Sequence, residues 1–281
     1  MPITNSPLRY PGGKSQLAPL VIELLRANDL FNGVYVEPFA GGAGIAWKLL
    51  LDGYVSEVWI NDIDRSIHAL WASVLRHADD LCERIETTHI TIEEWHKQRA
   101  IQQESRPKQL DLAFSTFFLN RTNRSGILKA GVIGGLTQQG NYGLDCRFNK
   151  VDLISRIQRI ALYREQVKLF RKDAAVFITE SVSRLPKQSL VNIDPPYYGK
   201  GRELYCSFYD HADHASLAKR IREIDQPWML TYDDVPEIRA LYEGLRVEQS
   251  ALNYSAQVKR VGIELLILGP TLALPKQLMA A

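Results

Sequence analysis

The stretch VYVEPFAGGAG, residues 34–44, decides how the first half of this chain folds. A short apolar run ends in Glu37, Pro38 and Phe39, and a glycine-rich turn then leads into the helix-like sequence IAWKLLLDG, which Gly53 closes. Glycines between a strand and a helix allow a sharp turn and a close approach to a ligand. The stretch predicts a strand, a turn and a helix, and at this point a turn without any ligand explains it equally well.

The same alternation of strand and helix runs through most of the chain. Before residue 77 the sequence predicts a helix over 15–26, a strand over 57–62 and a helix over 63–76. After residue 150 it predicts helices over 151–163, 173–184 and 214–224 and strands over 167–170, 189–193, 228–234 and 261–268. Strands that alternate with helices favour a doubly wound, mostly parallel α/β sheet.

The alternation stops between residues 77 and 150, where the sequence becomes polar and helical and then rich in glycine. The glycine-rich part, GILKAGVIGGLTQQGNYGLDCRF over 126–148, is typical of a hairpin with long turns. We therefore predict an inserted domain over 77–150, flanked by one domain made of residues 1–76 and 151–281.

The composition is that of an ordinary globular protein, with 281 residues, of which 46% are hydrophobic and 23% are charged. No apolar run is long enough to span a bilayer, and the first residues lack the apolar core of a signal peptide. Cys82, Cys146 and Cys206 are too far apart in sequence to form a metal-ligand pair or a disulfide framework. A cytoplasmic protein is the expectation.

The net charge of +2 is small, but its distribution is uneven. Between residues 118 and 172 eleven Lys and Arg stand against three acids, whereas the remainder is mildly acidic. A solvated helix face and a surface for a polyanion explain this excess equally well from charge alone.

Three predicted strands end in unusual residues, and in an open parallel sheet ligands bind where the strands end. The glycines after Glu37 and Phe39 are not spaced as Gly-x-Gly-x-x-Gly, so a cofactor without phosphates fits better than a dinucleotide. Asp62 ends the next strand, where a carboxylate can accept hydrogen bonds from both ribose hydroxyls, although capping of the following helix explains it as well.

The third strand end, VNIDPPYY over 191–198, points to a reaction at an aromatic amine. The carboxylate of Asp194 and the carbonyl of a rigid proline can both accept hydrogen bonds from an exocyclic amine, and Tyr197 offers a ring on which a base can stack. Two acceptors would aim the nitrogen lone pair at an electrophile and stabilise the developing charge.

This set of motifs resembles the Dam-type DNA N6-adenine methyltransferases, a class I family with the alpha order of motifs. The resemblance covers almost the whole chain and rests on RYPGGK, VEPFAGGAG, NDID, FFLNRTNRSG and DPPYY, in that order. It implies a class I methyltransferase sheet with a helical and hairpin-containing target-recognition insertion. It also implies S-adenosylmethionine as methyl donor, S-adenosylhomocysteine as product, and double-stranded DNA as substrate.

The resemblance assigns cofactor-binding roles to one set of residues, namely Tyr10, Gly13, Lys14, Glu37, Phe39, Gly41, Asp62, Ile63, Asp173 and Asp194. It assigns the catalytic motif to Asp194, Pro195, Pro196 and Tyr197. The chain departs from the family pattern Phe-x-Gly-x-Gly at Ala43, the position of the second glycine.

The resemblance makes double-stranded DNA the expected partner of the basic insertion. A target adenine inside a duplex must be flipped out before it can react, and the protein must hold the DNA while this happens. We expect DNA contacts from Asn120, Arg121, Asn123, Arg124, Lys129 and Arg147. The loop after the catalytic motif, with hinges at Gly199 and Gly201, is expected to close over the flipped base. The sequence DHADH is better explained by helix capping than by a metal, which methyl transfer does not need.

Three alternatives stay open at this point. An N4-cytosine methyltransferase would use the same chemistry, although aspartate rather than serine at position 194 favours adenine. A DNA-binding relative without activity and a nicotinamide dehydrogenase fit the motifs less well. The chain is expected to act as a monomer, and a restriction system or a mobile element would suit its biological context.

Overall fold

A computed structural model describes residues 5–9, 14–199, 209–254 and 260–275. The chain divides into two compact units. The first, here called the helical unit, contains residues 1–13 and 65–165, and the second, called the sheet unit, contains residues 14–64 and 166–281. The chain therefore passes between the units at three points of its sequence.

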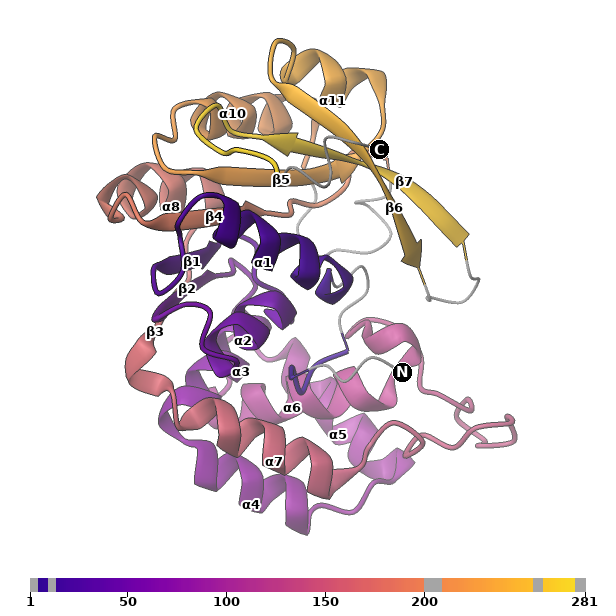
Figure 1. The fold of residues 1–281 in the computed structure, drawn as a ribbon. Coiled ribbons are helices and arrows are strands. Elements are labelled where there is room, and N and C mark those ends of the chain that lie inside the picture. Colours follow the sequence, from indigo (N-terminus) through magenta and orange to yellow (C-terminus); the bar gives the residue numbers. More distant parts are fainter. Residues whose placement is uncertain (1–4, 10–13, 200–208, 255–259, 276–281) are drawn as a thin grey trace. The chain divides into compact units, whose positions relative to one another are not determined.

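A seven-stranded sheet forms the centre of the sheet unit (Figure 1). Its strands follow the order β3-β2-β1-β4-β5-β7-β6, and β7 alone among these strands runs in the opposite direction, since it is antiparallel to both β5 and β6. The strands are β1 (Val34–Glu37), β2 (Glu57–Asn61), β3 (Val167–Phe170), β4 (Ser189–Ile193), β5 (Trp228–Asp233), β6 (Arg246–Tyr254) and β7 (Arg260–Leu268). The predicted mostly parallel α/β sheet is confirmed, and β6 is a strand that the sequence did not predict.

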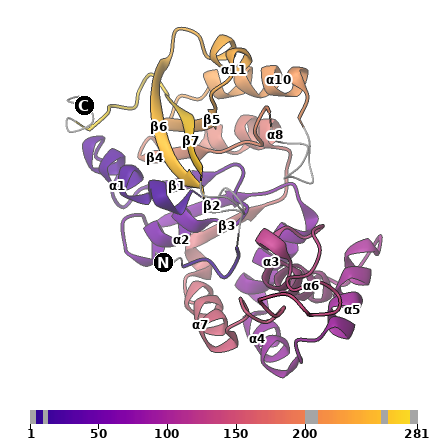
Figure 2. The same ribbon diagram turned by 90° about the vertical axis from the view of Figure 1, so that its right-hand side faces the viewer.

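Helices cover both faces of this sheet, with α1 and α2 on one side of the strands and α8, α10 and α11 on the other (Figure 2). Their bounds are α1 (Ala18–Ala27), after the 3-10 turn η1 (Ser15–Leu17), α2 (Gly44–Leu51), α8 (Ala174–Glu180), followed by η4 (Val182–Arg184), α10 (His211–Arg222) and α11 (Pro236–Leu241). Side chains alternate between the faces of a strand. Val36, Val191, Ile193, Leu230 and Leu265 accordingly join the core on the side of α8 and α10.

The helical unit is built around α6 (Gln109–Thr122), whose residues from Leu112 to Thr122 are all buried. It also contains α3 (Arg65–Arg76), α4 (Ala78–Thr87), α5 (Ile92–Gln103), η2 (Arg124–Gly126) and α7 (Lys150–Ala161), with η3 (Arg164–Gln166) at its end. Helices α3 and α5 contact α6, and α7 contacts α3 and α4. Helices α3 and α7 thus belong to this unit, which is larger than the predicted insertion over 77–150; the assignment of functions to the two domains stays a prediction.

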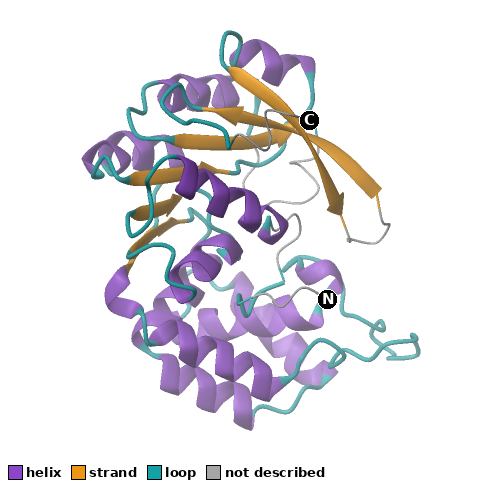
Figure 3. Ribbon diagram, in the orientation of Figure 1, coloured by secondary structure: helices purple, strands orange, loops and turns teal. Residues whose placement is uncertain are grey.

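The predicted hairpin within residues 126–148 is absent (Figure 3). This part of the chain, all of which is described, contains turns but no strand, and Val132 forms an isolated bridge with Asn123, which precedes it. Gly134 and Gly135 both have positive φ, and the amide of Gly140 donates to the carbonyl of Gly134. Successive tight turns therefore replace the alternating extended residues that a hairpin needs. Among the helices of the described residues, none is long and apolar enough to span a membrane.

Candidate active site

Polar side chains gather on one face of the sheet, near the carboxyl ends of β1, β4 and β5. On each of these strands the residues that alternate with the apolar core residues point to the side of α1 and α2. Strand β7 runs in the opposite direction and places an acid beside them, opposite Asp233 of β5 in the ladder. These polar residues are Tyr35, Glu37, Asn192, Asp194, Thr231 and Glu264.

Lys14 lies at the centre of this group, directly before η1. Its ammonium group forms an ion pair with Glu264, donates to the hydroxyl of Tyr197, and lies 3.5 Å from Oδ1 of Asp194. The hydroxyl of Tyr197 in turn donates to Glu264. The side chains of Lys14 and Glu264 are 5% and 3% exposed, so the two opposite charges are buried together. A buried charge is tolerated when it is paired in this way.

Asp194 follows the last residue of β4 and is held from the neighbouring strand. The hydroxyl of Thr231 on β5 donates to Oδ1 of Asp194 at 2.9 Å. The side chain of Asp194 is 24% exposed. Burial raises the pKa of Asp194, the ammonium group of Lys14 opposes this rise, and Glu264 adds to it. A carboxylate with a raised pKa is a stronger hydrogen-bond acceptor than an ordinary one.

The residues after Asp194 are fixed by burial and by β5. Pro195, Pro196 and Tyr197 are buried, and Tyr197 is only 8% exposed. The centroid of the Tyr197 ring lies 5.0 Å from the side-chain nitrogen of Lys14. The carboxylate of Asp233, which the sequence did not single out, accepts from the amides of Tyr198 at 3.0 Å and Gly199 at 2.8 Å. The turn that follows the motif is thus tied to the end of β5, and the hinge predicted at Gly201 lies outside the described residues.

The acid that follows β2 forms hydrogen bonds with the glycine-rich turn after β1. Asp62 accepts from the amide of Gly41 at 2.9 Å and from that of Asp64 at 2.9 Å, and burial raises its pKa to about 7. Gly41 has φ +46°, and Ala43, where the family pattern has glycine, has φ +47°. The turn therefore forms despite the substitution, at a cost of roughly 1 kcal/mol for a left-handed alanine.

The other predicted cofactor residues lie at the same edge of the sheet. Phe39 is half-buried, whereas Ile63, beside Asp62, is 46% exposed and presents an apolar surface to solvent. Asp173 caps α8, since its carboxylate accepts from the amides of Ala175 and Val176. Tyr10 and Gly13 lie outside the described residues.

Glu37 is buried at the end of β1, with 6% of its surface exposed. The hydroxyl of Tyr35 donates to it at 3.1 Å, and Asn192 of β4 donates to that hydroxyl at 2.8 Å. Burial raises the pKa of Glu37 to about 8, although the hydrogen bonds that Glu37 accepts lower it. At neutral pH this carboxyl is therefore largely protonated until a cation approaches it.

The six predicted DNA-binding residues fall into two groups. Arg124, Lys129 and Arg147 are exposed on the helical unit. Asn120, Arg121 and Asn123 are buried, and their polar atoms bond within that unit. Asn120 bonds to both backbone polar groups of Arg9, Arg121 donates to the carbonyl of Pro7, and Asn123 accepts from the indole of Trp95. The geometry gives these three residues hydrogen-bond partners within the unit, and the DNA contacts expected of them stay a prediction.

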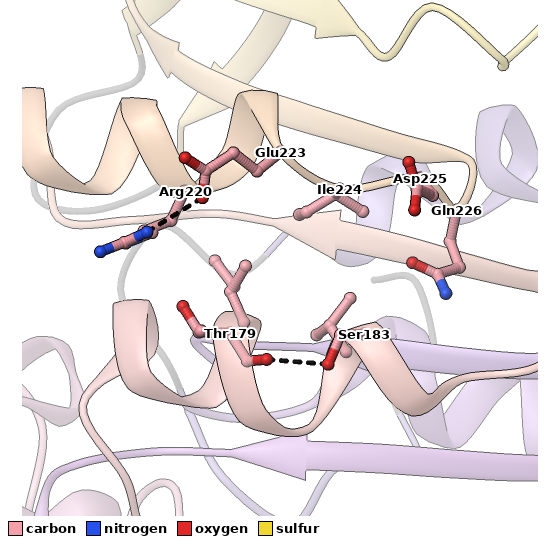
Figure 4. A pocket seen from close by; sticks show the side chains of 9 residues that line it. Thr179, Ser183, Arg220, Glu223, Ile224, Asp225 and Gln226 are labelled. Carbon is pink, nitrogen blue, oxygen red and sulfur yellow. Dashed lines mark hydrogen bonds and ion pairs between the residues drawn. The ribbon is translucent and has the colours of Figure 1, made fainter.

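A shallow hollow elsewhere on the sheet unit has no comparable chemistry (Figure 4). It lies between the α8–η4 segment and the end of α10, close to the amino ends of β4 and β5. The hydroxyls of Thr179 and Ser183 donate to helix carbonyls, and Arg220 pairs with Glu223 at 3.0 Å. Over the part of the chain that the structure describes, no group of three His, Cys, Asp or Glu is arranged to hold a metal ion.

Comparison with known proteins assigns the chain to a family. Residues 10–259 match the D12 class N6 adenine-specific DNA methyltransferases, and the chain belongs to this family. It is 24% identical to a protein from Methanocaldococcus jannaschii called Type II methyltransferase M.MjaIII, over 93% of this chain and 97% of that one. The resemblance stated from the sequence is confirmed at the level of the family.

Two solved structures that the fold resembles are also methyltransferases by name. The first, from Pyrococcus horikoshii, is a protein called RNA methyltransferase PH1948, with 15% identity, a TM-score of 0.44, and coverage of 93% of this chain and 85% of that one. The second is the rRNA methyltransferase aviRa from Streptomyces viridochromogenes, with 14% identity, a TM-score of 0.40, and coverage of 93% and 86%. Membership of the family makes the protein an adenine-specific DNA methyltransferase, and the family implies S-adenosylmethionine and DNA. Its own sheet is mostly parallel.

The charge pairing of Lys14 and Glu264 can be tested through stability. We expect Glu264→Gln to lower the free energy of unfolding by about 3 kcal/mol, because it leaves a buried ammonium group without its closest carboxylate. The double variant Lys14→Met/Glu264→Leu should regain most of this loss, since an apolar pair can replace a buried ion pair. Urea denaturation of the three proteins measures both effects, and a Glu264→Gln variant as stable as wild type would contradict the pairing.

The raised pKa of Glu37 predicts a pH dependence. The folded protein keeps a proton on Glu37 up to about pH 8, whereas the unfolded chain releases it near the ordinary value of 4.5. This group therefore makes the ligand-free protein less stable as the pH rises from about 5 to 8. Denaturation at several pH values should give a flatter profile for Glu37→Gln than for wild type. Glu23→Gln, at a partly exposed carboxylate of α1, should keep the wild-type slope, and identical profiles for Glu37→Gln and wild type would refute the assignment.

Proposed function

We propose that this enzyme methylates N6 of an adenine that has been flipped out of double-stranded DNA, with Asp194 orienting the amine. The observation that supports this proposal is a pair of contacts to Oδ1 of Asp194, a hydrogen bond from Thr231 at 2.9 Å and an ion pair with Lys14 at 3.5 Å. Both groups approach the same oxygen, which leaves the second oxygen to accept a hydrogen bond from the amine. The carbonyl of Pro195 is the second acceptor that we propose.

The hydrogen bonds then act on the nitrogen lone pair. An aromatic amine is a poor nucleophile while its lone pair is delocalised into the ring. Two acceptors that hold its hydrogens favour the geometry in which the lone pair points away from the ring plane, toward the methyl donor. As positive charge develops on the nitrogen, Asp194 stabilises it and is placed to take up the released proton, for which its raised pKa is suited.

The residues at the strand ends suit S-adenosylmethionine better than a phosphate-containing cofactor. The carboxylate of Asp62, which follows β2, would disfavour a pyrophosphate, and Glu37 at the end of β1, protonated in the ligand-free protein, would ionise beside a cation. Asp62 would hold the ribose hydroxyls, with Ile63 against the adenine, and Glu37 would face the charged amino acid part. When bound, the cofactor supplies an electrophilic methyl group on a sulfonium.

Cytosine N4 is the second candidate substrate, because it is also an exocyclic aromatic amine. The family to which the chain belongs is described as N6 adenine-specific, and this favours adenine. We retain adenine as the substrate. The relative from Methanocaldococcus jannaschii is named a Type II methyltransferase. A restriction system or a mobile element is the biological context that we propose for this chain.

The helical unit is the proposed target-recognition body, and an arginine cluster supports its binding to DNA. The cluster consists of Arg9, Arg121, Arg147 and Arg156. Arg121 and Arg156 donate to the carbonyls of Pro7 and Ser6, and Arg9 donates to that of Asn123. Burial and then the charges of Arg156 and Arg9 lower the pKa of Arg121 to about 9. One acid, Asp152, pairs with Arg156 at 2.8 Å, so an excess of positive charge is available to a DNA phosphate.

Product analysis tests the proposed reaction. The protein is incubated with S-adenosylmethionine and unmethylated double-stranded DNA, and the nucleosides are analysed by mass spectrometry. We expect N6-methyladenine from wild type and none from Asp194→Ala. Thr231→Val should slow turnover about tenfold, because it removes one hydrogen bond to Asp194.

The matched control is Thr179→Val, which removes a hydroxyl on the exposed surface of α8 and should not change turnover. N4-methylcytosine as the product would overturn the choice of substrate. Full activity of Asp194→Ala would overturn the role of the motif.

The salt dependence of DNA binding tests the arginine cluster. Arg147→Gln should weaken binding for all sequences and reduce the slope of log K against log salt by about 1, as expected for one lost phosphate contact. Arg164→Gln is the control, because Arg164 is an exposed arginine of the same unit that pairs with Glu165. Equal slopes for Arg147→Gln and wild type would argue against a phosphate contact there.

A further inference from the structure

The end of strand β5 presents two polar side chains to the segment that follows β4. Thr231 and Asp233 alternate with Tyr232, so they point to the same face of the sheet. The hydroxyl of Thr231 donates to Asp194 at 2.9 Å, at the start of the catalytic motif. Asp233 accepts from the backbone amides that directly follow the motif. One strand therefore restrains the motif at both of its ends.

The two oxygens of the Asp233 carboxylate have separate partners. Oδ1 accepts from the amide of Tyr198 at 3.0 Å, and Oδ2 accepts from the amide of Gly199 at 2.8 Å. A Cβ atom on Gly199 would lie 3.3 Å from Oδ2, so the carboxylate approaches the backbone closely. Hydrogen bonds to an ionised acceptor are stronger than those between neutral groups. Because these amides belong to the two peptide planes that border Tyr198, both planes are fixed.

The position of Asp233 in the sheet is unfavourable for an acid that lacks such partners. Asp233 stands directly opposite Glu264 in the antiparallel ladder of β5 and β7. Like charges at opposite positions of a strand pair repel each other. Glu264 forms an ion pair with Lys14, and Asp233 accepts from the two amides. The carboxylate thus stabilises the turn after the motif and not the pairing of the two strands.

The side chain of Tyr198 is fixed on the opposite side from that of Tyr197. Tyr198 packs against the core that α8 and α10 cover, with its ring centroid 5.1 Å from that of His214. Its hydroxyl shares a hydrogen bond of 3.2 Å with Nδ1 of His211. The hydroxyl of Tyr197 lies among the buried charges on the other face. A rotation of the peptide plane between the two tyrosines would displace both rings, and the hydrogen bond from this plane to Asp233 opposes it.

The prolines of the motif do not provide this restraint. The ring of a proline fixes its own φ and leaves the dihedral angles of the next residue free. The restraint from the proline rings therefore ends at Pro196, whereas the residue whose ring is offered to a base is Tyr197. The peptide plane on the carbonyl side of Tyr197 is the one that Asp233 fixes.

We propose that Asp233 is a positioning residue for methyl transfer, which orients Tyr197 toward the target base by accepting from the two amides that follow it. The inference rests on the proposed function, because it assumes that a base binds at the motif. In this proposal Asp233 contacts neither the methyl donor nor the amine, and it acts through Tyr197. It adds to the site a residue that lies outside the motifs on which the resemblance rests.

Three substitutions separate positioning from a general loss of stability. Asp233→Ala removes both acceptors, and Asp233→Asn keeps the shape and one acceptor. Asp234→Asn is the matched control, because it makes the same change at the next residue. The carboxylate of Asp234 accepts from the guanidinium group of Arg239 at 2.6 and 2.8 Å, on the exposed surface.

The rate of a single turnover is measured with saturating S-adenosylmethionine and unmethylated double-stranded DNA, so that product release does not contribute. Asp233→Ala should lower this rate by roughly ten- to a hundredfold, as expected for the loss of two hydrogen bonds to a charged acceptor. Asp233→Asn should lower it by a smaller factor, and Asp234→Asn should keep the wild-type rate. In titration calorimetry all three variants should bind S-adenosylhomocysteine as tightly as wild type does, because Asp233 does not contact the cofactor.

A folded Asp233→Ala variant with the wild-type rate would overturn the inference. A loss of affinity for S-adenosylhomocysteine equal to the loss of rate would also overturn it, because the substitution would then disturb the whole edge of the sheet. A rate that returns to that of wild type well below the temperature of thermal unfolding would assign the effect to stability. An equal loss of rate in Asp234→Asn would assign it to the lost charge.

If Asp233→Ala does not fold, Asp233→Asn decides, since it keeps one of the two bonds, and a wild-type rate in that variant would overturn the inference. Failure of the proposed function is recognised separately. A wild-type protein that binds S-adenosylhomocysteine but methylates no DNA would overturn the proposed reaction, and this result is independent of the variants.

Discussion

The buried ammonium group of Lys14 is the constraint on which the active-site edge of the sheet depends. Glu264, Asp194 and Tyr197 converge on it from β7 and from the segment after β4. Two carboxylates in the same buried region would repel each other and would favour their protonated forms. The ammonium group forms an ion pair with Glu264, and it moderates the rise in the pKa of Asp194. The catalytic motif is thus held in place by charge balance as well as by its prolines.

This arrangement requires a particular strand order. Strand β4 lies between β1 and β5, and β7 lies next to β5, so one face of four strands can bring its polar residues together. The alternation of side chains then separates two environments. One face carries the apolar core under α8 and α10, and the other carries Glu37, Asp194, Thr231 and Glu264 near one edge. Strand β7 is antiparallel to β5, so Glu264, which lies near the middle of β7, stands beside the carboxyl end of β5.

The sequence was sufficient for local features and insufficient for those that depend on distant pairing. Glu37, Asp62 and Asp194 could be found because parallel strands gather their carboxyl ends at one edge. Glu264 was missed because its partner Lys14 is 250 residues away, although a single acid within the apolar run VGIELLIL was a signal that it must be paired. Asp233 and Thr231 were also missed, because their partners Tyr198 and Asp194 lie on a different segment of the chain. Asn120, Arg121 and Asn123 stand in a polar motif, and only the packing of α6 reveals that they face the interior.

Ala43 gives the turn after β1 a property that a glycine would not. A left-handed alanine is costly, but once it is held there it has fewer other conformations to visit than glycine has. A ligand that bound against this turn would therefore restrict the backbone less than it would restrict a glycine. In this chain the departure from the family pattern lowers folding stability somewhat and leaves the turn after β1 with fewer accessible conformations.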